Sequence, residues 1–333
     1  MPLRRIIFSS VAVALTMVGA TVASAQDRPD PGLGIRLLEA PSARANDPRA
    51  KSYIVDFVAP GTNFTRSFEI SNGSSRAMDV DLYGGAARVE GGAFVPEDRG
   101  VENRLTPWMT VTPAKARLAP GARKRAQVSV AVPASATAGE YYGAVWAEVP
   151  GVAPPGGGAA VANRVGIRVY LGVGAGGEPA TSFKLESFAP SLSPEGRPGV
   201  DIRTCNDGGR AIDLTGELSL TEGPGGVSAG PFRGEKSLTL GPRQCDQATI
   251  QLDPKLPKGP WRASVKLQSG EDERKAEATI TFPDEPGGGA PVDAEATEKS
   301  SAVKVALLVG LLVLLAVATV LFLLWRRRRE ADG

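Results

Sequence analysis

The sequence of 333 residues contains no histidine and two cysteines, and its formal net charge is +2. Without histidine the chain cannot build Ser-His-Asp or Cys-His nucleophilic sites, the common zinc sites, or histidine acid–base catalysis. Residues 26–301 carry 31 Lys and Arg against 34 Asp and Glu, a net charge of −3, whereas nucleic-acid binding requires a basic surface. The composition therefore predicts a protein that is not an enzyme, does not bind nucleic acid, and uses no cofactor or metal.

The first element in chain order is a targeting segment. Two arginines, Arg4 and Arg5, precede the apolar stretch Ile6–Ala20, and Ala23-Ser24-Ala25 fits a cleavage site for small residues. An apolar stretch of this length with these flanks is typical of a secretory signal peptide. We expect residues 1–25 to be a signal peptide, and the mature chain to begin at Gln26.

An internal repeat follows. The stretch "NGSSRAMDV" at 72–80 returns as "NDGGRAIDL" at 206–214, an offset of 134 residues. "LAPGAR" at 118–123 returns as "LGPRQC" at 240–245, an offset of 122, so the first copy carries about a dozen extra residues. We place that insertion at 84–107. The repeat indicates two related domains in tandem, at 33–177 and 181–282.

Both copies show the period-two alternation of β-strands, with Pro, Gly, Asn and Asp clusters between the strands. Regular short strands separated by turn residues are typical of antiparallel sandwiches. The predicted fold class is all-β, with two tandem immunoglobulin-like β-sandwiches followed by one transmembrane helix. Apolar residues alternate in these stretches: 78–82, 126–132, 165–173, 212–220, 263–267 and 276–282.

The two cysteines lie at equivalent ends of two strands of the second copy. Cys205 ends the strand before its turn, and Cys245 begins a later strand after "LGPR". Antiparallel neighbours would bring them together, and the disulfide would close a loop of 40 residues, worth about 4 kcal/mol in the chain-entropy model. We predict a structural disulfide between Cys205 and Cys245, with a reactive thiol as the alternative.

Two glycine- and proline-rich stretches are candidate connections. "PGVAPPGGGAA" at 150–160 precedes a strand at 161–174, so we interpret it as a long hairpin loop and place the interdomain linker near 174–180. The acidic stretch 283–301 is rich in Pro and Gly, which predicts a disordered linker.

A predicted membrane span follows. Val305–Trp325 is a run of 21 uncharged residues, long enough as a helix to cross the hydrocarbon core, and Arg326–Arg329 come directly after it. Positive charge beside a span stays in the cytoplasm. We predict a transmembrane helix at 302–325, a cytoplasmic basic tail at 326–333, and a single-pass plasma-membrane protein with its bulk outside the cell.

Aligning the two copies exposes one difference. In the second copy Arg262, Ser264 and Lys266 lie on the strand face opposite Trp261, whereas the first copy places Tyr142, Ala144, Trp146 and Glu148 there. Aromatic rings beside a carboxylate can hold sugar rings by apolar contact and hydrogen bonds. We therefore predict Tyr142, Trp146 and Glu148 as an exposed glycan- or partner-binding site. The alternative is that the insertion at 84–107 or the strand at 161–174 covers this face.

The first copy resembles a known family. The succession "PGTNFTRSFEISNGSSRAMDVDLYGGAA", "WMTVTPAKARLAPG", "PASATAGEYYGAVWAEV" and "NRVGIRVYLGVG" is similar to the peptidoglycan-binding-domain type of WxL-interacting proteins. These are membrane-anchored surface proteins of Gram-positive bacteria. The resemblance covers residues 33–177 and implies a first domain that binds peptidoglycan, and a WxL-type surface protein as a partner.

These observations give two functional hypotheses. The first is a non-catalytic surface protein whose first sandwich binds peptidoglycan or another cell-wall glycan. The alternative is a protein-interaction or chaperone-like subunit of a surface complex, with the strand around Tyr142 as an edge or face for β-augmentation. A wall hydrolase is a weaker hypothesis, because the sequence places no pair of carboxylates at a defined separation.

Overall fold

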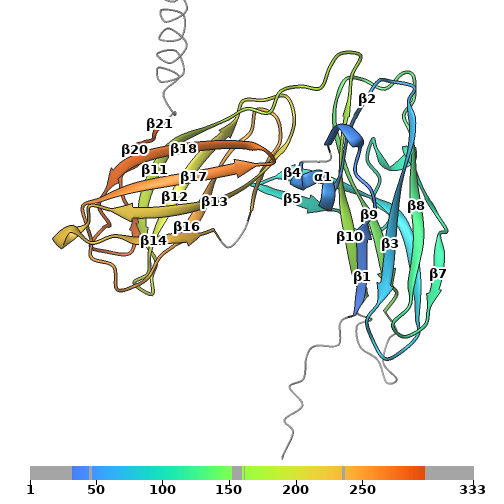
Figure 1. Ribbon diagram of the computed structural model, residues 1–333, viewed down its shortest axis with the longest axis horizontal. Helices are drawn as coiled ribbons and strands as arrows, with labels where there is room; N and C mark the ends of the chain where they lie inside the picture. The colour runs from blue at the N-terminus through green and yellow to red at the C-terminus, as the bar shows by residue number, and fades with distance from the viewer. Residues whose placement is uncertain (1–31, 45–46, 152–159, 161, 235–236, 297–333) are drawn as a thin grey trace, which may run out of the picture.

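The computed structural model describes residues 32–44, 47–151, 160, 162–234 and 237–296, which form strands with very little helix (Figure 1). The strands make four sheets, two from residues 33–173 and two from residues 183–296. We call these pairs the first sandwich and the second sandwich. The predicted all-β, immunoglobulin-like fold is confirmed for this part of the chain.

The terminal predictions concern residues that the structure does not describe. The signal peptide at 1–25, the transmembrane helix at 302–325 and the tail at 326–333 all lie outside the described ranges. Within those ranges, no helix has the length and apolar character needed to cross a bilayer.

The first sandwich packs a four-stranded sheet against a six-stranded sheet. The first sheet runs in the order β1 (Leu33–Leu37), β3 (Asn63–Asn72), β8 (Arg123–Ala131), β6 (Met109–Thr112). The second runs β2 (Ile54–Val58), β10 (Asn163–Val173), β9 (Gly139–Val149), β4 (Met78–Glu90), β5 (Ala93–Pro96), with β7 (Lys115–Leu118) also paired to β4. Its short helical turns are η1 (Ser42–Arg44), α1 (Pro48–Ser52) and η2 (Thr106–Trp108).

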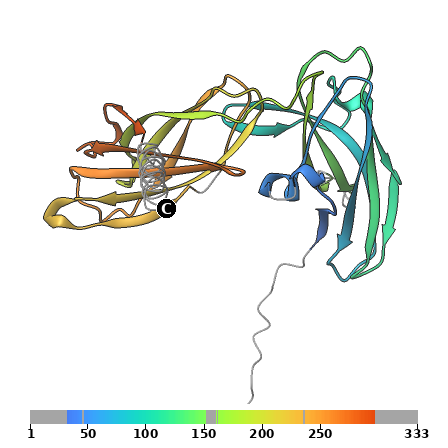
Figure 2. The same cartoon turned by 45° about the horizontal axis from the view of Figure 1, so that its top comes forward.

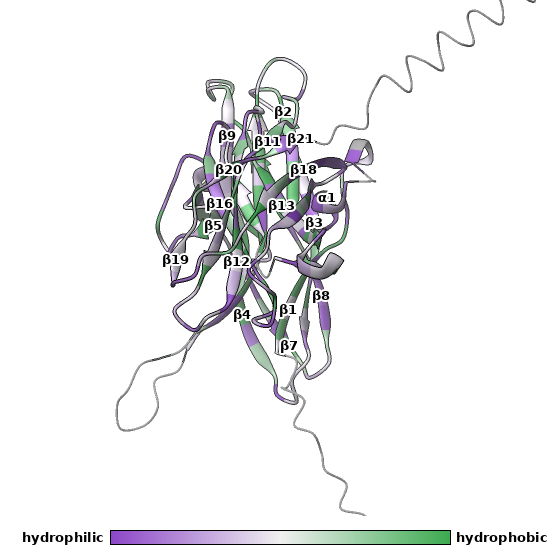
Figure 3. Ribbon diagram, turned by 90° about the vertical axis from the view of Figure 1, so that its left-hand side faces the viewer, coloured by the Kyte–Doolittle hydropathy of each residue, from purple (hydrophilic) through white to green (hydrophobic). Residues whose placement is uncertain are grey.

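The second sandwich has the same plan. Its first sheet contains β16 (Cys245–Gln251), β12 (Pro198–Asn206), β11 (Phe183–Leu192), β19 (Gly287–Gly288) and β20 (Val292–Asp293). Its second contains β14 (Ala229–Arg233), β13 (Ile212–Thr221), β15 (Leu238–Leu240), β17 (Trp261–Ser269), β18 (Asp272–Ile280) and β21 (Glu295–Ala296), with the turn η3 (Pro224–Gly226). Figure 3 shows apolar residues, in green, gathered along the strands of both sandwiches.

The repeated turn has the same structure in both copies. The side-chain amide of Asn72 donates to the backbone carbonyls of Arg76, Leu118 and Ala119. The amide of Asn206 donates in the same way to the carbonyls of Arg210, Leu240 and Gly241. Both asparagines are 1% exposed. In each copy, therefore, a buried asparagine of the repeated turn is hydrogen-bonded to the "LAPG" or "LGPR" segment beside it.

A second equivalence lies at the start of β9 and β17. The Tyr141 hydroxyl donates to the carbonyl of Thr137 over 2.6 Å, and the Trp261 indole N–H donates to the carbonyl of Pro257 over 2.8 Å. Each bond reaches back four residues and fixes a large buried ring at the entrance to its strand. Trp108 packs on the first of these rings, with 4.8 Å between its ring centre and that of Tyr141.

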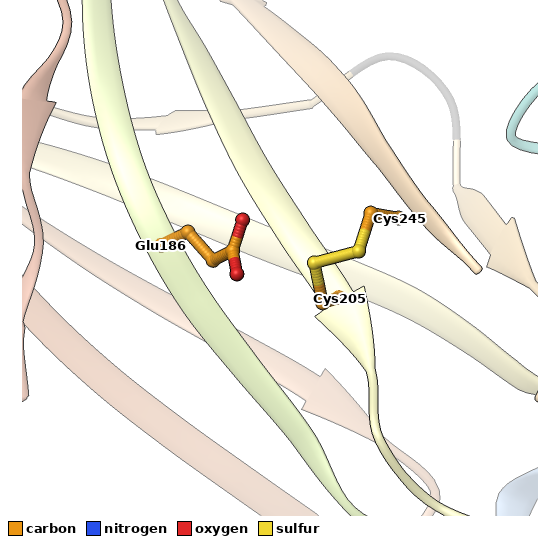
Figure 4. A group of neighbouring side chains, drawn as sticks. All are labelled: Glu186, Cys205 and Cys245. Atoms are coloured by element: carbon orange, nitrogen blue, oxygen red, sulfur yellow. A yellow bond between two sulfur atoms is a disulfide. The ribbon is translucent and has the colours of Figure 1, made fainter. Parts of the chain in front are cut away.

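The predicted disulfide is confirmed. Cys205 of β12 and Cys245 of β16 are direct partners across the two antiparallel strands and are joined through their sulfurs (Figure 4). β9 and β10 pair antiparallel along their length, so residues 150–162 connect two hairpin strands as expected.

Residues 283–301 were predicted to be a disordered linker, and residues 297–301 lie outside the described ranges. Within 283–296 the structure differs from the prediction: β19 and β20 pair with β11, and β21 pairs with β18. The backbone of these short strands fills hydrogen-bonding positions along the edges of the second sandwich, which composition alone does not register.

The two sandwiches meet at an angle, at the end of the first sandwich where β4 and β5 project (Figures 1 and 2). The tip of the β4–β5 hairpin lies within the stretch 84–107. Its carbonyls at Val89 and Gly92 accept from the Gln244 side chain over 3.1 Å and from the Thr239 backbone N–H over 2.8 Å. Residues of the stretch 84–107 therefore contact the second sandwich. We call the whole contact region the junction.

Candidate interaction surface

A buried ion pair anchors the junction. Arg49, held at the start of α1 with its N–H bonded to the side chain of Asp47, donates through Nε to Oδ2 of Asp213 over 2.9 Å. Oδ1 of Asp213 accepts from the Tyr170 and Thr239 hydroxyls over 2.9 and 2.8 Å. The Asp213 residue is only 9% exposed, but both of its carboxylate oxygens are hydrogen-bonded. The Asp213 carboxylate is therefore satisfied, whereas Nη2 of Arg49 is buried without a hydrogen-bond partner among the described residues. The ion pair joins the first sandwich to the second.

The predicted site on β9 lies on the same outer face of the second sheet as this junction. Tyr142, Trp146 and Glu148 were predicted to be exposed, but Glu148 is 7% exposed and the two rings are part-buried. β9 also lies between β10 and β4, so it has no free edge for an added strand. The predictions of an exposed face and of a free edge at this strand are therefore both wrong. Neighbouring elements cover much of the face, and neighbouring strands occupy both edges.

Tyr142 belongs to the junction. Its ring meets that of Tyr170 edge-on, with 6.0 Å between centres, and its hydroxyl donates to Glu140 Oε2 over 2.7 Å. The same oxygen accepts from the backbone N–H of Ala211, in the second sandwich, over 2.6 Å. Burial, followed by the negative charge of Glu140, raises the pKa of Tyr142. Tyr142 is therefore a packing and hydrogen-bonding residue between the sandwiches.

Trp146 lies flat across the sheet, over two glycines. A Cβ on Gly85 of β4 would come within 2.6 Å of the indole nitrogen, and one on Gly166 of β10 within 2.5 Å of ring carbon Cε3. The guanidinium of Arg164 lies 4.5 Å from the ring centre. The ring is thus held between the backbone below and a cation, a contact that stabilises both groups.

Glu148 joins a neighbouring cluster. Its carboxylate accepts from the Tyr83 hydroxyl over 2.5 Å and from Arg99 over 2.8 Å, and the Arg99 guanidinium lies 4.7 Å from the Tyr83 ring centre. The hydrogen bond from Tyr83, together with Arg99, lowers the pKa of Glu148. Burial and that same hydrogen bond raise the pKa of Tyr83 to about 12. Arg99 comes from the insertion at 84–107, as the alternative interpretation of this face anticipated.

Arg168 completes the row toward the junction. Its guanidinium lies 5.1 Å from the ring centre of Tyr53 and 5.0 Å from that of the buried Phe94, and it pairs with Asp213 over 3.2 Å. Its side chain remains 31% exposed. We call the exposed and part-exposed members of this row the arginine–aromatic face: Tyr53, Tyr83, Arg99, Trp146, Arg164 and Arg168.

The arginines beside Trp146 were not among the residues predicted from the sequence. The alternation assigned to 165–173 already places Arg164 and Arg168 on the face opposite Val165 and Ile167. The sequence therefore held a signal for part of this surface. The pairing of β10 with β9, which brings Gly166 opposite Trp146, became visible only in the structure.

One further cluster has the donor types of a metal site. Glu186, Cys205 and Cys245 bring ligand atoms within 4.8 Å of one another (Figure 4). Both sulfurs are committed to the disulfide, so neither is a thiolate that could bind a metal.

Comparison with known proteins gives the following. No protein-family model matches the sequence, and no curated protein matches it. Among solved structures, the E. coli chaperone DraB is 13% identical, with 73% of this chain and 95% of that chain covered and a TM-score of 0.37. The YadV chaperone is 11% identical, with 78% and 98% covered and a TM-score of 0.38. The Salmonella enterica SafA pilin in complex with the SafB chaperone gives 10% identity, coverage of 79% and 95%, and a TM-score of 0.38.

Proposed function

We propose that the chain is a non-catalytic protein-interaction module whose arginine–aromatic face binds a protein partner. The observation that carries this proposal is the row of Trp146, Arg164, Tyr83 and Arg99, which continues along the sheet from the junction and is at least part-exposed. Tyr, Trp and Arg are the residue types enriched at protein interfaces and among their energetic hot spots.

The contacts that hold these side chains in place favour a role in binding over a role as ordinary solvent-exposed residues. Trp146 is fixed over Gly85 and Gly166, and Arg99 is fixed by Glu148 and Asp81. Rings and guanidinium groups that are ordered before binding lose little conformational entropy when a partner arrives. Arg164 has no carboxylate partner among the described residues, so its charge is available to one.

Binding of peptidoglycan or another wall glycan stays a prediction. A sugar-binding platform needs an open aromatic face, and here the backbone lies under the Trp146 ring and Arg164 lies over it. The Tyr142 ring packs on Tyr170 in the junction. The geometry therefore supports the protein partner better.

The proposed location of this module rests on the sequence. A signal peptide at 1–25 and a membrane span at 302–325 would leave both sandwiches on the outer side of the plasma membrane, tethered through the end of the second sandwich. On this proposal the module meets its partner at the cell surface. Resemblance to the WxL-interacting proteins makes a WxL-type surface protein one partner to test.

Site-specific photo-crosslinking in cells tests the proposal. The full-length chain carries a photoreactive amino acid at position 164, or at position 129 on the outer face of the opposite sheet as a control. We expect position 164 to give one dominant protein adduct that position 129 does not give. Addition of Trp146→Ala should reduce that adduct severalfold, whereas Arg117→Ala, at an exposed position on β7, should not.

Two outcomes would count against a protein partner. Equal labelling at positions 164 and 129 would show that the arginine–aromatic face has no dedicated partner. An adduct that muramidase digestion converts to small fragments would show that the crosslinked molecule is wall glycan.

A further inference from the structure

A second surface lies at the end of the first sandwich that is far from the junction, on the β1–β3–β8 sheet (Figures 1 and 2). Three exposed arginines gather there around one carboxylate, Glu69. We call this set the basic face; its cations are Arg36, Arg123 and Arg125.

Strand register brings these residues together from three strands. Glu69 of β3 lies opposite Arg36 of β1 on one side and opposite Arg125 of β8 on the other. Arg123 lies two residues before Arg125 on β8 and points to the same side of the sheet. Lys124, between them, is exposed but points to the other side of the strand, so it is not part of this face. The arrangement is therefore set by the sheet itself.

Glu69 orients two of the guanidinium groups while leaving most of their donors free. Arg36 pairs with Oε1 of Glu69 over 2.8 Å and Arg123 with the same oxygen over 3.6 Å. The side chains of Arg36 and Arg123 are still 63% and 67% exposed. Each guanidinium carries five N–H donors, so both can also bind a second anion. The hydrogen bond from Arg36, with the charges of Arg123 and Arg125, lowers the pKa of Glu69.

The second sandwich shows that the fold does not require these cations. Its equivalent pairs are Arg203 with Gln247, and Cys205 with Cys245, in the same register as Glu69 with Arg125 and Ser71 with Arg123. Where β8 begins Arg-Lys-Arg, β16 begins Cys-Asp-Gln. Two repeated sheets thus differ in charge at one end without differing in strand pairing.

We propose that the basic face binds an anionic polymer that carries repeated phosphate groups. Three arginines against one carboxylate repel one another, and an anionic ligand relieves that repulsion. Guanidinium groups match phosphate oxygens with paired hydrogen bonds, and a fixed row of them suits successive phosphates along a chain. This proposal is independent of the arginine–aromatic face, which lies on the other sheet of the sandwich.

Binding of inorganic polyphosphate to the full-length chain in detergent tests the proposal. The variant Arg36→Gln/Arg123→Gln/Arg125→Gln removes the three arginines of the basic face. The control Arg197→Gln/Lys255→Gln/Lys258→Gln removes three exposed cations of the second sandwich. We expect the first variant to weaken binding at least ~10-fold at low salt, and to flatten the slope of log affinity against log salt by about 0.7 per cation removed. The control should retain wild-type affinity and slope.

Three results would overturn the proposal. The first is no polyphosphate binding by the wild-type chain. The second is an equal loss in both variants, because total charge and not this surface would then govern binding. The third is binding to vesicles of anionic phospholipid but not to polyphosphate, which would assign the surface to a membrane. Thermal unfolding of both variants at wild-type temperatures confirms that each comparison concerns folded protein.

Discussion

Arg49 of the first sandwich and Asp213 of the second form an ion pair of 2.9 Å whose side chains are only 7% and 8% exposed. A pair buried this deeply gains little from Coulomb attraction alone, because both groups lose their hydration. Here the Asp213 carboxylate also accepts from two hydroxyls, so its remaining lone pairs are satisfied. The pair therefore holds the two sandwiches in one specific arrangement. Arg168 of the arginine–aromatic face also contacts Asp213, so its position depends on this pair.

The first prediction concerns this buried ion pair. Asp213→Ala leaves Arg49 buried without a counter-charge, and we expect it to destabilise the protein by about 3–5 kcal/mol. The control Asp79→Ala breaks an exposed ion pair with Arg117 and should leave stability near that of the wild type. Urea unfolding of both variants provides the measurement. Equal midpoints for Asp213→Ala and wild type would contradict the role given to the buried pair.

The second prediction concerns the repeated turn. Asn72→Ala and Asn206→Ala each leave three backbone carbonyls, in buried or part-buried positions, without their hydrogen-bond donor. Each substitution should therefore lower the free energy of unfolding by about 1–3 kcal/mol. Asn63→Ala, at an exposed position on β3, is the matched control and should have little effect. The measurement is the unfolding midpoint of each variant. Losses that differ greatly between Asn72 and Asn206 would show that the two turns are not energetically equivalent.

The third prediction concerns the disulfide. Cys205→Ala/Cys245→Ala opens a loop of 40 residues, and the chain-entropy model gives a loss of about 4 kcal/mol for the second sandwich. The first sandwich has Ser71 and Arg123 at the equivalent register and should keep its stability. Hydrogen exchange measured residue by residue reports the stability of each sandwich separately. Equal loss of protection in both sandwiches would show that they unfold as one cooperative unit.

The fourth prediction concerns Glu140 and pH. Burial raises the pKa of this carboxyl, although hydrogen bonds from Tyr142 and Ala211 partly oppose that effect. A carboxyl whose folded pKa lies above its unfolded value binds more protons when folded, so its contribution to stability falls as pH rises between the two pKa values. Glu140→Gln removes this dependence while its amide oxygen can still accept both bonds.

We therefore expect Glu140→Gln to gain stability relative to the wild type as the pH rises from acid to neutral, with no further change above that. Unfolding temperatures of the two proteins across this range give the comparison. A difference that is constant with pH would show that Glu140 has an ordinary pKa in the folded protein.

Much of the fold could be predicted from local pattern. Period-two alternation placed Tyr141, Val145 and Ala147 in the core, where they are 5% exposed or less. The offset between the two copies aligned Asn72 with Asn206 and Tyr141 with Trp261, and the structure gives each pair equivalent bonds. These features depend on neighbours in sequence or on a repeated motif, so pattern alone was sufficient.

The candidate site could be predicted only in part. The comparison of copies pointed to the outer face of β9, but alternation reports which side of a strand a residue occupies and not what covers that side. Tyr142 packs against a buried cluster that includes Ala211 of the second sandwich, and Arg164 of the neighbouring strand lies over Trp146. Both coverings come from residues distant in the sequence.

The sequence by itself determined the two-sandwich plan, the repeat, the disulfide and the absence of histidine chemistry. Each of these follows directly from residue types and their spacing along the chain. The tertiary structure decided that the insertion at 84–107 reaches the second sandwich, that Arg49 meets Asp213, and that arginines stack on Trp146 and Tyr83. Such contacts depend on strand pairing and on the angle between the sandwiches. These are set by the packing free energy of the whole chain, which no local pattern contains.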